Sequence, residues 1–272
     1  FVPHFGGAVA NVAARCVRHG GRAALAGGVG DDGWGAWLRA RLEAEGVELD
    51  WFELVEGAQT PIAFVTVDGD ARPSFSIYGA GIAAGIGAAG PRLDEAVASC
   101  DALFVSSNTL VGEDQRALTF AARDRSADLG HPVVVDPNLR PRRWPSATRA
   151  AQETRELLRG AFLVKCNEEE ATLLSGERDP DAAARGILAA GARHVVVTLG
   201  PDGALLRGGR MDRDVDGVPA TPVDTTGAGD AFMGVLLARL SQSDFYAPTI
   251  AAALPEAVEV AARTTEHWGA LP

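Results

Sequence analysis

The chain has 272 residues, 47% of them hydrophobic, and a formal net charge of −11 at pH 7. This length suffices for one large domain with a substantial core, and no apolar run approaches the roughly 20 residues that a membrane-spanning helix needs. The acidic balance argues against a nucleic-acid partner, because binding to a phosphate backbone needs clustered lysine and arginine. We therefore expect a globular α/β protein with neither a membrane nor a nucleic acid as its partner.

Short apolar segments alternate with segments of helical periodicity along most of the chain. The apolar segments predict buried strands at residues 22–27, 102–106, 132–136, 161–165 and 194–199. The periodic segments predict helices near 8–19, 34–46, 113–128, 148–159 and 179–191, and helices dominate beyond residue 229. This alternation predicts a mostly parallel sheet covered by helices on both faces.

One section breaks the alternation. Residues 61–67 and 72–78 have period-two patterning around a turn at residues 68–70, which predicts an antiparallel hairpin. Residues 79–90 include five glycines and predict a flexible return. A hairpin inserted between βα units has no place in a parallel sheet and must project from it.

The cysteines and the lysine limit the chemistry. Cys16, Cys100 and Cys166 are far apart and lack C-x-x-C spacing, which indicates reduced thiols rather than a disulfide framework or a cysteine zinc site. We therefore expect a cytoplasmic protein. Lys165 is the only lysine, so the chain has no G-x-x-x-x-G-K-[ST] phosphate loop. Phosphates would have to be bound by backbone groups, a metal and arginine.

The most informative segment spans residues 223–232 and has the sequence VDTTGAGDAF. Gly227, Ala228 and Gly229 precede an apolar, helix-forming run, so free N–H groups and the positive end of the helix dipole lie at this turn. Glycines let a phosphate approach such groups closely. Asp230 is electrostatically awkward beside a phosphate, which favours a general base that accepts a proton from an attacking hydroxyl. On GAGD alone, an aspartate that merely favours a helix N-terminus is an equal alternative.

The longer string DTTGAGDAF resembles the signature of the PfkB/ribokinase family of sugar kinases. Residues 6–13, GGAVANVA, are similar to the family's GG…N motif, residues 28–32 resemble its G-x-G-x-D segment, and residues 167–170 fit its N-x-x-E motif. Residues 136–144, DPNLRPRRW, resemble a segment of its fructokinase and 2-keto-3-deoxygluconate kinase branches. The resemblance implies a ribokinase-like three-layer α/β fold, with a central mostly parallel sheet flanked by helices and a small β-sheet lid. It also implies transfer of the γ-phosphate of MgATP to a sugar hydroxyl.

The resemblance extends to organisation and ligands. It implies a single domain over residues 1–272, with lid strands from about 1–5 and 61–79. Its ligands would be a small-molecule sugar, ATP, Mg²⁺ and a monovalent cation such as K⁺, and a homodimer would form through the lid. The family begins with a strand and an acidic residue that binds the sugar before the GG motif, whereas here the glycines are residues 6 and 7. Since a central strand is costly to lose, we expect the sequence to be truncated.

The resemblance also implies a role for each motif residue. Asp230 would be the base, with developing negative charge stabilised by Gly227, Ala228 and Gly229. Sugar contacts are expected from Gly6, Gly7, Asn11, Tyr78 and Arg140. Nucleotide contacts are expected from Asn167, Thr198, Gly200, Gly203 and Gly229. Mg²⁺ would be positioned through water by Asn167 and Glu170, and the monovalent cation would be bound by Asp224 and Thr226 with carbonyls near Gly269.

Other interpretations stay open. Residues 28–33 also match the G-x-G-x-x-G of dinucleotide sites, although two carboxylates there would repel a pyrophosphate, and a glycine turn with Asp32 capping a helix explains them equally. Asn11 could merely cap a helix, and acidic residues favour the helix start at 168–170 in any case. A catalytically idle sugar- or nucleotide-binding protein is the alternative from another class.

The residues that follow Tyr78, at the end of the second expected lid strand, indicate which class of sugar is the substrate. Tyr78 is followed by Gly79, Ala80 and Gly81, whereas sugar-acid kinases of the family often have an arginine there. A carboxylate left unpaired in a closed pocket would cost several kcal/mol. We therefore expect a neutral ketohexose such as fructose. A sugar acid such as 2-keto-3-deoxygluconate, or a nucleoside, is the alternative, with Arg72 or Arg140 as the substitute cation for an acid.

Overall fold

The computed structural model describes residues 2–209 and 211–271. The chain divides into two compact units, one made of Phe1–Ala96 with Val218–Pro272 and the other of Val97–Gly217. The single domain expected over residues 1–272 stays a prediction. Among the described residues, no helix is both long and apolar enough to cross a membrane.

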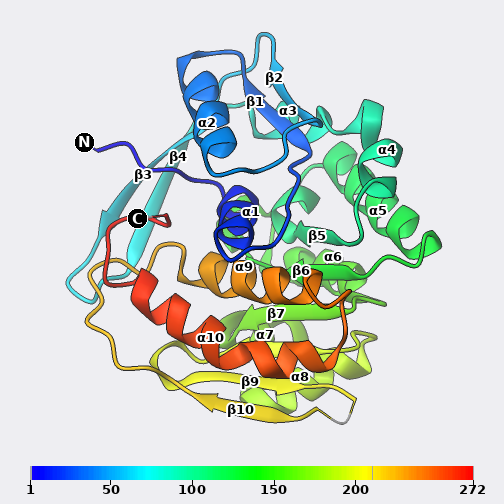
Figure 1. The fold of residues 1–272 in the computed structure, drawn as a ribbon, viewed down its shortest axis with the longest axis vertical. Coiled ribbons are helices and arrows are strands. Elements are labelled where there is room, and N and C mark those ends of the chain that lie inside the picture. Colours follow the sequence, from blue (N-terminus) through cyan, green and yellow to red (C-terminus); the bar gives the residue numbers. More distant parts are fainter. Residues whose placement is uncertain (1, 210, 272) are drawn as a thin grey trace. The chain divides into compact units, whose positions relative to one another are not determined.

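The unit of residues 97–217 is built on a six-stranded sheet with the order β10-β9-β8-β7-β6-β5 (Figure 1). Neighbours from β5 to β8 pair in parallel, and β9 and β10 are added antiparallel, so the predicted mostly parallel sheet is confirmed. The strands are β5 (Leu103–Ser106), β6 (Val133–Asp136), β7 (Leu163–Asn167), β8 (Val195–Thr198), β9 (Gly203–Arg207) and β10 (Arg213–Asp216). The helices of this unit are α5 (Glu113–Asp128), α6 (Ala147–Leu158), α7 (Glu168–Ser175) and α8 (Pro180–Ala189).

Buried apolar side chains hold the central strands of this sheet in place, and polar residues lie at the carboxyl ends of these strands. Strands β6 to β8 are valine-rich and buried along nearly their whole length, as expected for strands covered on both faces. Their last residues are polar: Asp136 ends β6, Asn167 ends β7 and Thr198 ends β8, with Asn167 paired to Thr198. The carboxyl ends of parallel strands are where ligands bind in open α/β sheets.

Helices dominate the other unit near the C-terminus. Helix α9 (Ala228–Ser241) packs against both α1 (Ala8–Arg18) and α10 (Pro248–Thr264). Most of α9 is buried, which explains why its sequence is apolar on every side. Gly234 allows the close approach of α1, since a Cβ there would lie 2.4 Å from the Cβ of Arg15.

Two small sheets complete that unit. Strand β1 (Gly27–Gly30) pairs in parallel with β2 (Phe52–Val55), and β3 (Ile62–Val67) pairs with β4 (Pro73–Tyr78) as the predicted antiparallel hairpin (Figure 1). The remaining helices are α2 (Gly33–Ala44), α3 (Ile82–Gly87) and α4 (Leu93–Ala98). Residues 2–5, expected to contribute a lid strand, are not in a strand, and residue 1 lies outside the described residues.

Two local predictions were wrong, and glycine packing explains both. The strand expected at residues 22–27 is β1, which begins at Gly27 instead. Its glycines let it run close to β2, because a Cβ at Gly28 would lie 2.5 Å from the carbonyl oxygen of Glu53. The expected flexible return contains α3, which packs on β1, and a Cβ at Gly85 would lie 2.2 Å from the oxygen of Gly28. These glycines therefore permit tight packing rather than flexibility.

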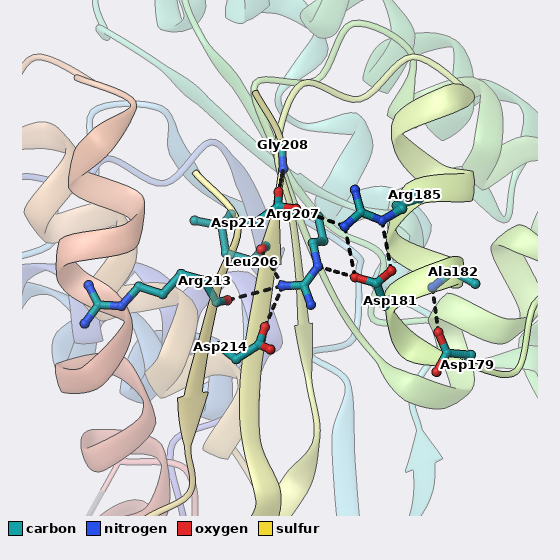
Figure 2. Close-up of polar contacts among 10 residues, drawn as sticks. All are labelled: Asp179, Asp181, Ala182, Arg185, Leu206, Arg207, Gly208, Asp212, Arg213 and Asp214. Carbon is teal, nitrogen blue, oxygen red and sulfur yellow. Dashed lines mark hydrogen bonds and ion pairs between the residues drawn. The ribbon is translucent and has the colours of Figure 1, made fainter. Parts of the chain in front are cut away.

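An ion-pair network attaches α8 to the edge of the six-stranded sheet (Figure 2). Asp181 on α8 accepts hydrogen bonds from the guanidinium groups of Arg185, at 2.9 Å, and of Arg207 on β9. Arg207 also donates to Asp214 on β10 at 2.5 Å, and Arg185 pairs with Asp212 at 2.9 Å. Strands β9 and β10, which the bond between Arg207 and Asp214 joins in addition to their backbone pairing, were not predicted from the sequence.

Candidate active site

The GAGD turn begins α9 in the predicted manner. Gly227 is its N-cap and has the left-handed backbone conformation, with φ of 79°. A side chain is also excluded there by packing, because a Cβ would lie 2.4 Å from the Cβ of Ala270. The N–H of Ala228 donates to the carbonyl of Thr225 at 3.3 Å, a long bond that an anionic ligand could replace. The turn is therefore suited to binding an anion.

Asp230 lies in the first turn of α9 and is bound by Asn11. The side-chain Nδ2 of Asn11 donates to Oδ2 of Asp230 at 2.7 Å, so α1 and α9 bring together two motifs that are 219 residues apart. Asn11 is only 5% exposed, and its Oδ1 is buried without a hydrogen-bond partner among the described residues. Buried polar atoms are normally paired, so this oxygen indicates a ligand group, and Asn11 is not the helix cap considered above. Gly7 is the N-cap of α1, and both it and Gly6 are exposed.

The predicted monovalent-cation residues also lie together. Asp224 is 3% exposed and its carboxylate accepts the N–H groups of Thr226 and Gly269, each at 2.9 Å. The hydroxyl oxygen of Thr226 is buried without a partner in the described part of the chain. A buried carboxylate beside an unpaired hydroxyl oxygen fits a small cation, which prefers oxygen ligands.

The turn of the β3–β4 hairpin is attached to the segment that contains Asp224 and Thr226. The carbonyl of Ala71 accepts the N–H of Thr225 at 3.0 Å and its hydroxyl at 3.1 Å. Tyr78 lies at the other end of the hairpin, where it is 61% exposed and packs edge-on against Phe64 with ring centroids 5.6 Å apart. The tyrosine ring is therefore largely accessible.

In the unit of residues 97–217, Asn167 and Glu170 form a capping box at the start of α7. Oδ1 of Asn167 accepts the N–H of Glu170 at 2.8 Å, and Oε2 of Glu170 accepts the N–H of Asn167 at 3.0 Å. Oε1 of Glu170 accepts the N–H of Leu139 at 2.7 Å, which fixes the DPNLR loop. Burial, and after it the charge of Asp136, raises the pKa of Glu170.

Asp136 has a buried partner that was not predicted from the sequence. The ammonium of Lys165 donates to Oδ2 of Asp136 at 2.9 Å, and both side chains are buried. Oδ1 of Asp136 accepts the N–H of Asn138, whose φ is 42°. The available signal was a lysine inside an otherwise apolar strand, because a buried charge needs a partner. Arg15 is a similar case, because an arginine on the buried side of α1 also indicates a charge that needs a partner.

The residues of this unit fit Mg²⁺ only as partial ligands. Among the described residues, no group of three or more His, Cys, Asp or Glu side chains could hold a metal ion. Glu170 already binds two N–H groups but retains lone pairs for a hydrated ion, and Asn167 is exposed. Since Mg²⁺ keeps several waters and binds substrate phosphates, one carboxylate and one amide suffice.

The remaining predicted residues occupy this unit as well. Arg140 is exposed at the end of the DPNLR loop, and Thr198 ends β8 with its hydroxyl donating to the carbonyl of Cys166 at 3.4 Å. Gly200 begins a short 3₁₀ turn and Gly203 follows it, with φ of 57° and 102°. A Cβ at Gly203 would lie 2.0 Å from the oxygen of Val215, so β9–β10 pairing alone already requires a glycine there.

The structure favours the structural explanation of Asp32. Its carboxylate caps α2 by accepting the N–H groups of Trp34 at 3.0 Å and Gly35 at 2.9 Å. It also accepts the N–H of Thr60, and that bond is the largest cause of a lowered pKa. Gly28 and Gly30 lie within β1 rather than in a phosphate-binding turn, so the dinucleotide interpretation has no support here.

The similarity to known proteins extends along nearly the whole chain. The family described as pfkB family carbohydrate kinase matches residues 1–271. Fructokinase-2 of Solanum habrochaites is 33% identical over 236 residues, which cover 86% of this chain and 72% of that protein. Fructokinase-1 of Oryza sativa subsp. japonica is 33% identical over 243 residues, with coverage of 89% and 75%.

Solved structures resemble this one closely. The fructokinase from Vibrio cholerae O395, in its fructose, ADP and calcium ion bound form, has a TM-score of 0.85 and 31% identity, covering 99% of this chain and 88% of that one. A putative ribokinase II from E. coli, in complex with ATP and Mg²⁺, has a TM-score of 0.85 at 24% identity, with coverage of 100% and 85%. These likenesses confirm the ribokinase-like α/β fold.

Proposed function

Because the chain belongs to the pfkB family of carbohydrate kinases, we propose that it transfers the γ-phosphate of ATP to a hydroxyl of fructose. The observation that carries this proposal is the position of Asp230, in the first turn of α9 after the glycine turn and hydrogen-bonded to Asn11. A base beside free helix N–H groups is the arrangement that phosphoryl transfer to an alcohol needs. The fructokinases among the relatives support fructose, and the ADP in the Vibrio cholerae structure supports an adenine nucleotide.

In the proposed reaction, Asp230 accepts the proton of the sugar hydroxyl as its oxygen attacks the γ-phosphorus. The N–H groups of Gly227, Ala228 and Gly229 stabilise the negative charge that develops, and Ala228 exchanges its long bond to Thr225 for the phosphate. Asn11 has one task for each polar atom: Nδ2 orients the base, and the unpaired Oδ1 accepts a sugar hydroxyl. Gly6, Gly7 and Tyr78 provide further sugar contacts, and Arg140 neutralises phosphoryl charge.

Metal and nucleotide roles belong to the same proposal. Asn167 and Glu170 position a hydrated Mg²⁺, which neutralises charge on the phosphates when bound. Thr198, Gly200 and Gly203 contribute nucleotide contacts together with Gly229. Asp224 and Thr226 bind K⁺, for which the unpaired hydroxyl oxygen of Thr226 is the support.

The hairpin supports a neutral sugar. Tyr78 lies at the open end of β3–β4, paired with Ile62, whereas Arg72 precedes Pro73 at the turn. Five residues separate Pro73 from Tyr78, about 16 Å along a strand, and Arg72 faces Asp70 at 4.0 Å. Arg72 is therefore not the cation that a sugar acid would need beside the tyrosine.

A coupled assay of ADP release tests the substrate. We expect kcat/KM for fructose to exceed that for 2-keto-3-deoxygluconate by at least tenfold, since an unpaired carboxylate in the closed site opposes binding. A preference for the acid would overturn the choice of fructose but not the kinase assignment. Absence of ADP release with every sugar of a broad panel would favour an idle binding protein.

The hairpin face that carries Val65, Phe75 and Ile77, opposite the face of Tyr78, supports a homodimer. Cross-strand pairs on this face are entirely apolar, and Val65, Phe75 and Ile77 are 42%, 43% and 50% exposed. A two-stranded hairpin is marginal alone in water, so a second copy of the chain covering this face would stabilise it. Sedimentation should give a dimer for the wild type and a monomer for Phe75→Glu, and a monomeric wild type would refute the proposal.

The free thiols of Cys16, Cys100 and Cys166 support the cytoplasm as the location.

A further inference from the structure

Arg15 is a buried cation on α1, one helical turn after Asn11. It is 8% exposed, and its Nη2 donates to the carbonyl of Ala270 at 2.8 Å and to the hydroxyl of Thr264 at 3.2 Å. Among the described residues, its Nε has no partner and no carboxylate forms an ion pair with it. A buried guanidinium without an ion pair opposes folding, so a role other than stability is needed to explain it.

The carbonyl that Arg15 binds belongs to the segment behind the glycine turn. Ala270 is 2% exposed and lies against Gly227, where a Cβ would be 2.5 Å from the Cα of Ala270. The neighbouring Gly269 donates its N–H to Asp224 at 2.9 Å. Residues 269–270 are thus fixed by two bonds and form a wall against the turn from which the anion-binding N–H groups project.

The backbone and Cβ of Arg15 also pack against the middle of α9. Gly234 has no side chain where Arg15 passes, and a Cβ there would collide with the Cβ of Arg15. Burial and the charge of Arg18 lower the pKa of Arg15, while the carboxylates of Glu45 and Asp230 act in the opposite direction. The direct polar contacts of Arg15 are with Thr264 and with Ala270 in the wall of the turn.

We infer that Arg15 is a positioning residue for phosphoryl transfer: its bond to Ala270 holds the 269–270 wall against Gly227 and so aligns the N–H groups of residues 227–229. This inference rests on the proposed function of the GAGD turn. A neutral side chain would fill the space but would leave the carbonyl of Ala270 without its charged donor, and small displacements of a preorganised donor set slow a reaction strongly.

The test compares Arg15→Met, Arg15→Lys and the control Arg18→Met. Arg18 is on the same helix, but it pairs with Glu45 at 2.6 Å near the surface, so its loss removes an arginine from α1 without reaching Ala270. Each variant is assayed below its Tm with fructose and ATP, and calorimetric titration with ADP gives the fraction of competent sites. The measured kcat is then expressed per competent site.

We expect Arg15→Met to lower kcat about 10- to 100-fold while KM for the sugar stays within about threefold, because alignment at the transition state is lost rather than sugar binding. Arg15→Lys should recover part of this loss, since an ammonium can donate to the same carbonyl, and Arg18→Met should retain the wild-type kcat. A per-site kcat of Arg15→Met near wild type, an equal loss in Arg18→Met, or no recovery by lysine would overturn the inference.

If Arg15→Met does not fold, Arg15→Gln, whose side chain is shorter and neutral, decides the question. A reduced per-site kcat at unchanged sugar KM supports the positioning role, and an unchanged kcat overturns it. Asp230→Asn is measured in parallel to separate this inference from the function on which it rests. If that variant remains active, the proposed role of the GAGD segment fails; if it is inactive while the Arg15 variants are normal, only the role of Arg15 fails.

Discussion

Asn11 donates a hydrogen bond of 2.7 Å to the carboxylate of Asp230, and this bond joins the first and last motifs of the chain. The bond uses one of the two polar atoms of the amide and leaves the buried Oδ1 for a ligand. An aspartate that served only as a favourable helix-start charge would not need a buried amide to orient it. The pair therefore favours a general base over the electrostatic alternative.

Replacing Asp230 by Asn should lower kcat by roughly two to four orders of magnitude, because the amide cannot accept the proton of the sugar hydroxyl. Folding and nucleotide binding should change little, since the amide is isosteric. The measurement is ADP release at saturating fructose, with Asp114→Asn, an exposed aspartate on α5, as the control. Activity of Asp230→Asn within about threefold of wild type would refute the assignment.

Replacing Glu170 by Gln should raise the Mg²⁺ concentration required for half-maximal activity, because a neutral amide holds a hydrated cation less well. The adjacent Glu169 is exposed in the same acidic helix start and provides the matched control Glu169→Gln. Circular dichroism is needed alongside, because the amide also replaces an acceptor of two backbone N–H groups. Equal Mg²⁺ titrations of both variants would assign Glu170 to helix capping alone.

Replacing Thr226 by Val should remove most of the stimulation of activity by K⁺ relative to tetramethylammonium, since valine keeps the shape but lacks the oxygen. Thr225→Val is the matched control, because the hydroxyl of Thr225 already donates to Ala71 at 3.1 Å. K⁺ stimulation should persist in that control. Wild-type activity that is indifferent to K⁺ would contradict the cation site.

The network around Asp181 should make stability depend on pH (Figure 2). Hydrogen bonds from Arg185 and then Arg207 hold the pKa of Asp181 below its ordinary value of 3.8. A lowered pKa means that the stabilisation is present above the unfolded-state pKa and is lost as pH falls through the folded-state value. Asp181→Asn should therefore have a lower Tm than wild type near neutral pH, and the gap should close as pH falls through the lowered folded-state pKa of Asp181. A gap that is constant from neutral to acidic pH would show that packing, not charge, is responsible.

Local patterns in the sequence determined much of the fold. Helix α5 occupies residues 113–128 as predicted, and the hairpin strands lie within one residue of their expected bounds, because helical and period-two patterns are set by neighbours along the chain. The start of α9 at the GAGD turn also follows from local chemistry, namely small residues that leave helix N–H groups open. The family could be identified from the sequence motifs alone, of which the DTTGAGDAF string is the most specific.

Tertiary packing decided the rest, because it joins residues that are distant in the sequence. Gly27–Gly30 is a strand only because β2 approaches its backbone, and the glycines of α3 serve the same close contact. The bonds Asn11–Asp230, Lys165–Asp136 and Arg15–Ala270 span 219, 29 and 255 residues, so no window of local sequence contains both partners. The sequence thus determined which residues could do the chemistry, and the fold decided which of them hold one another in place.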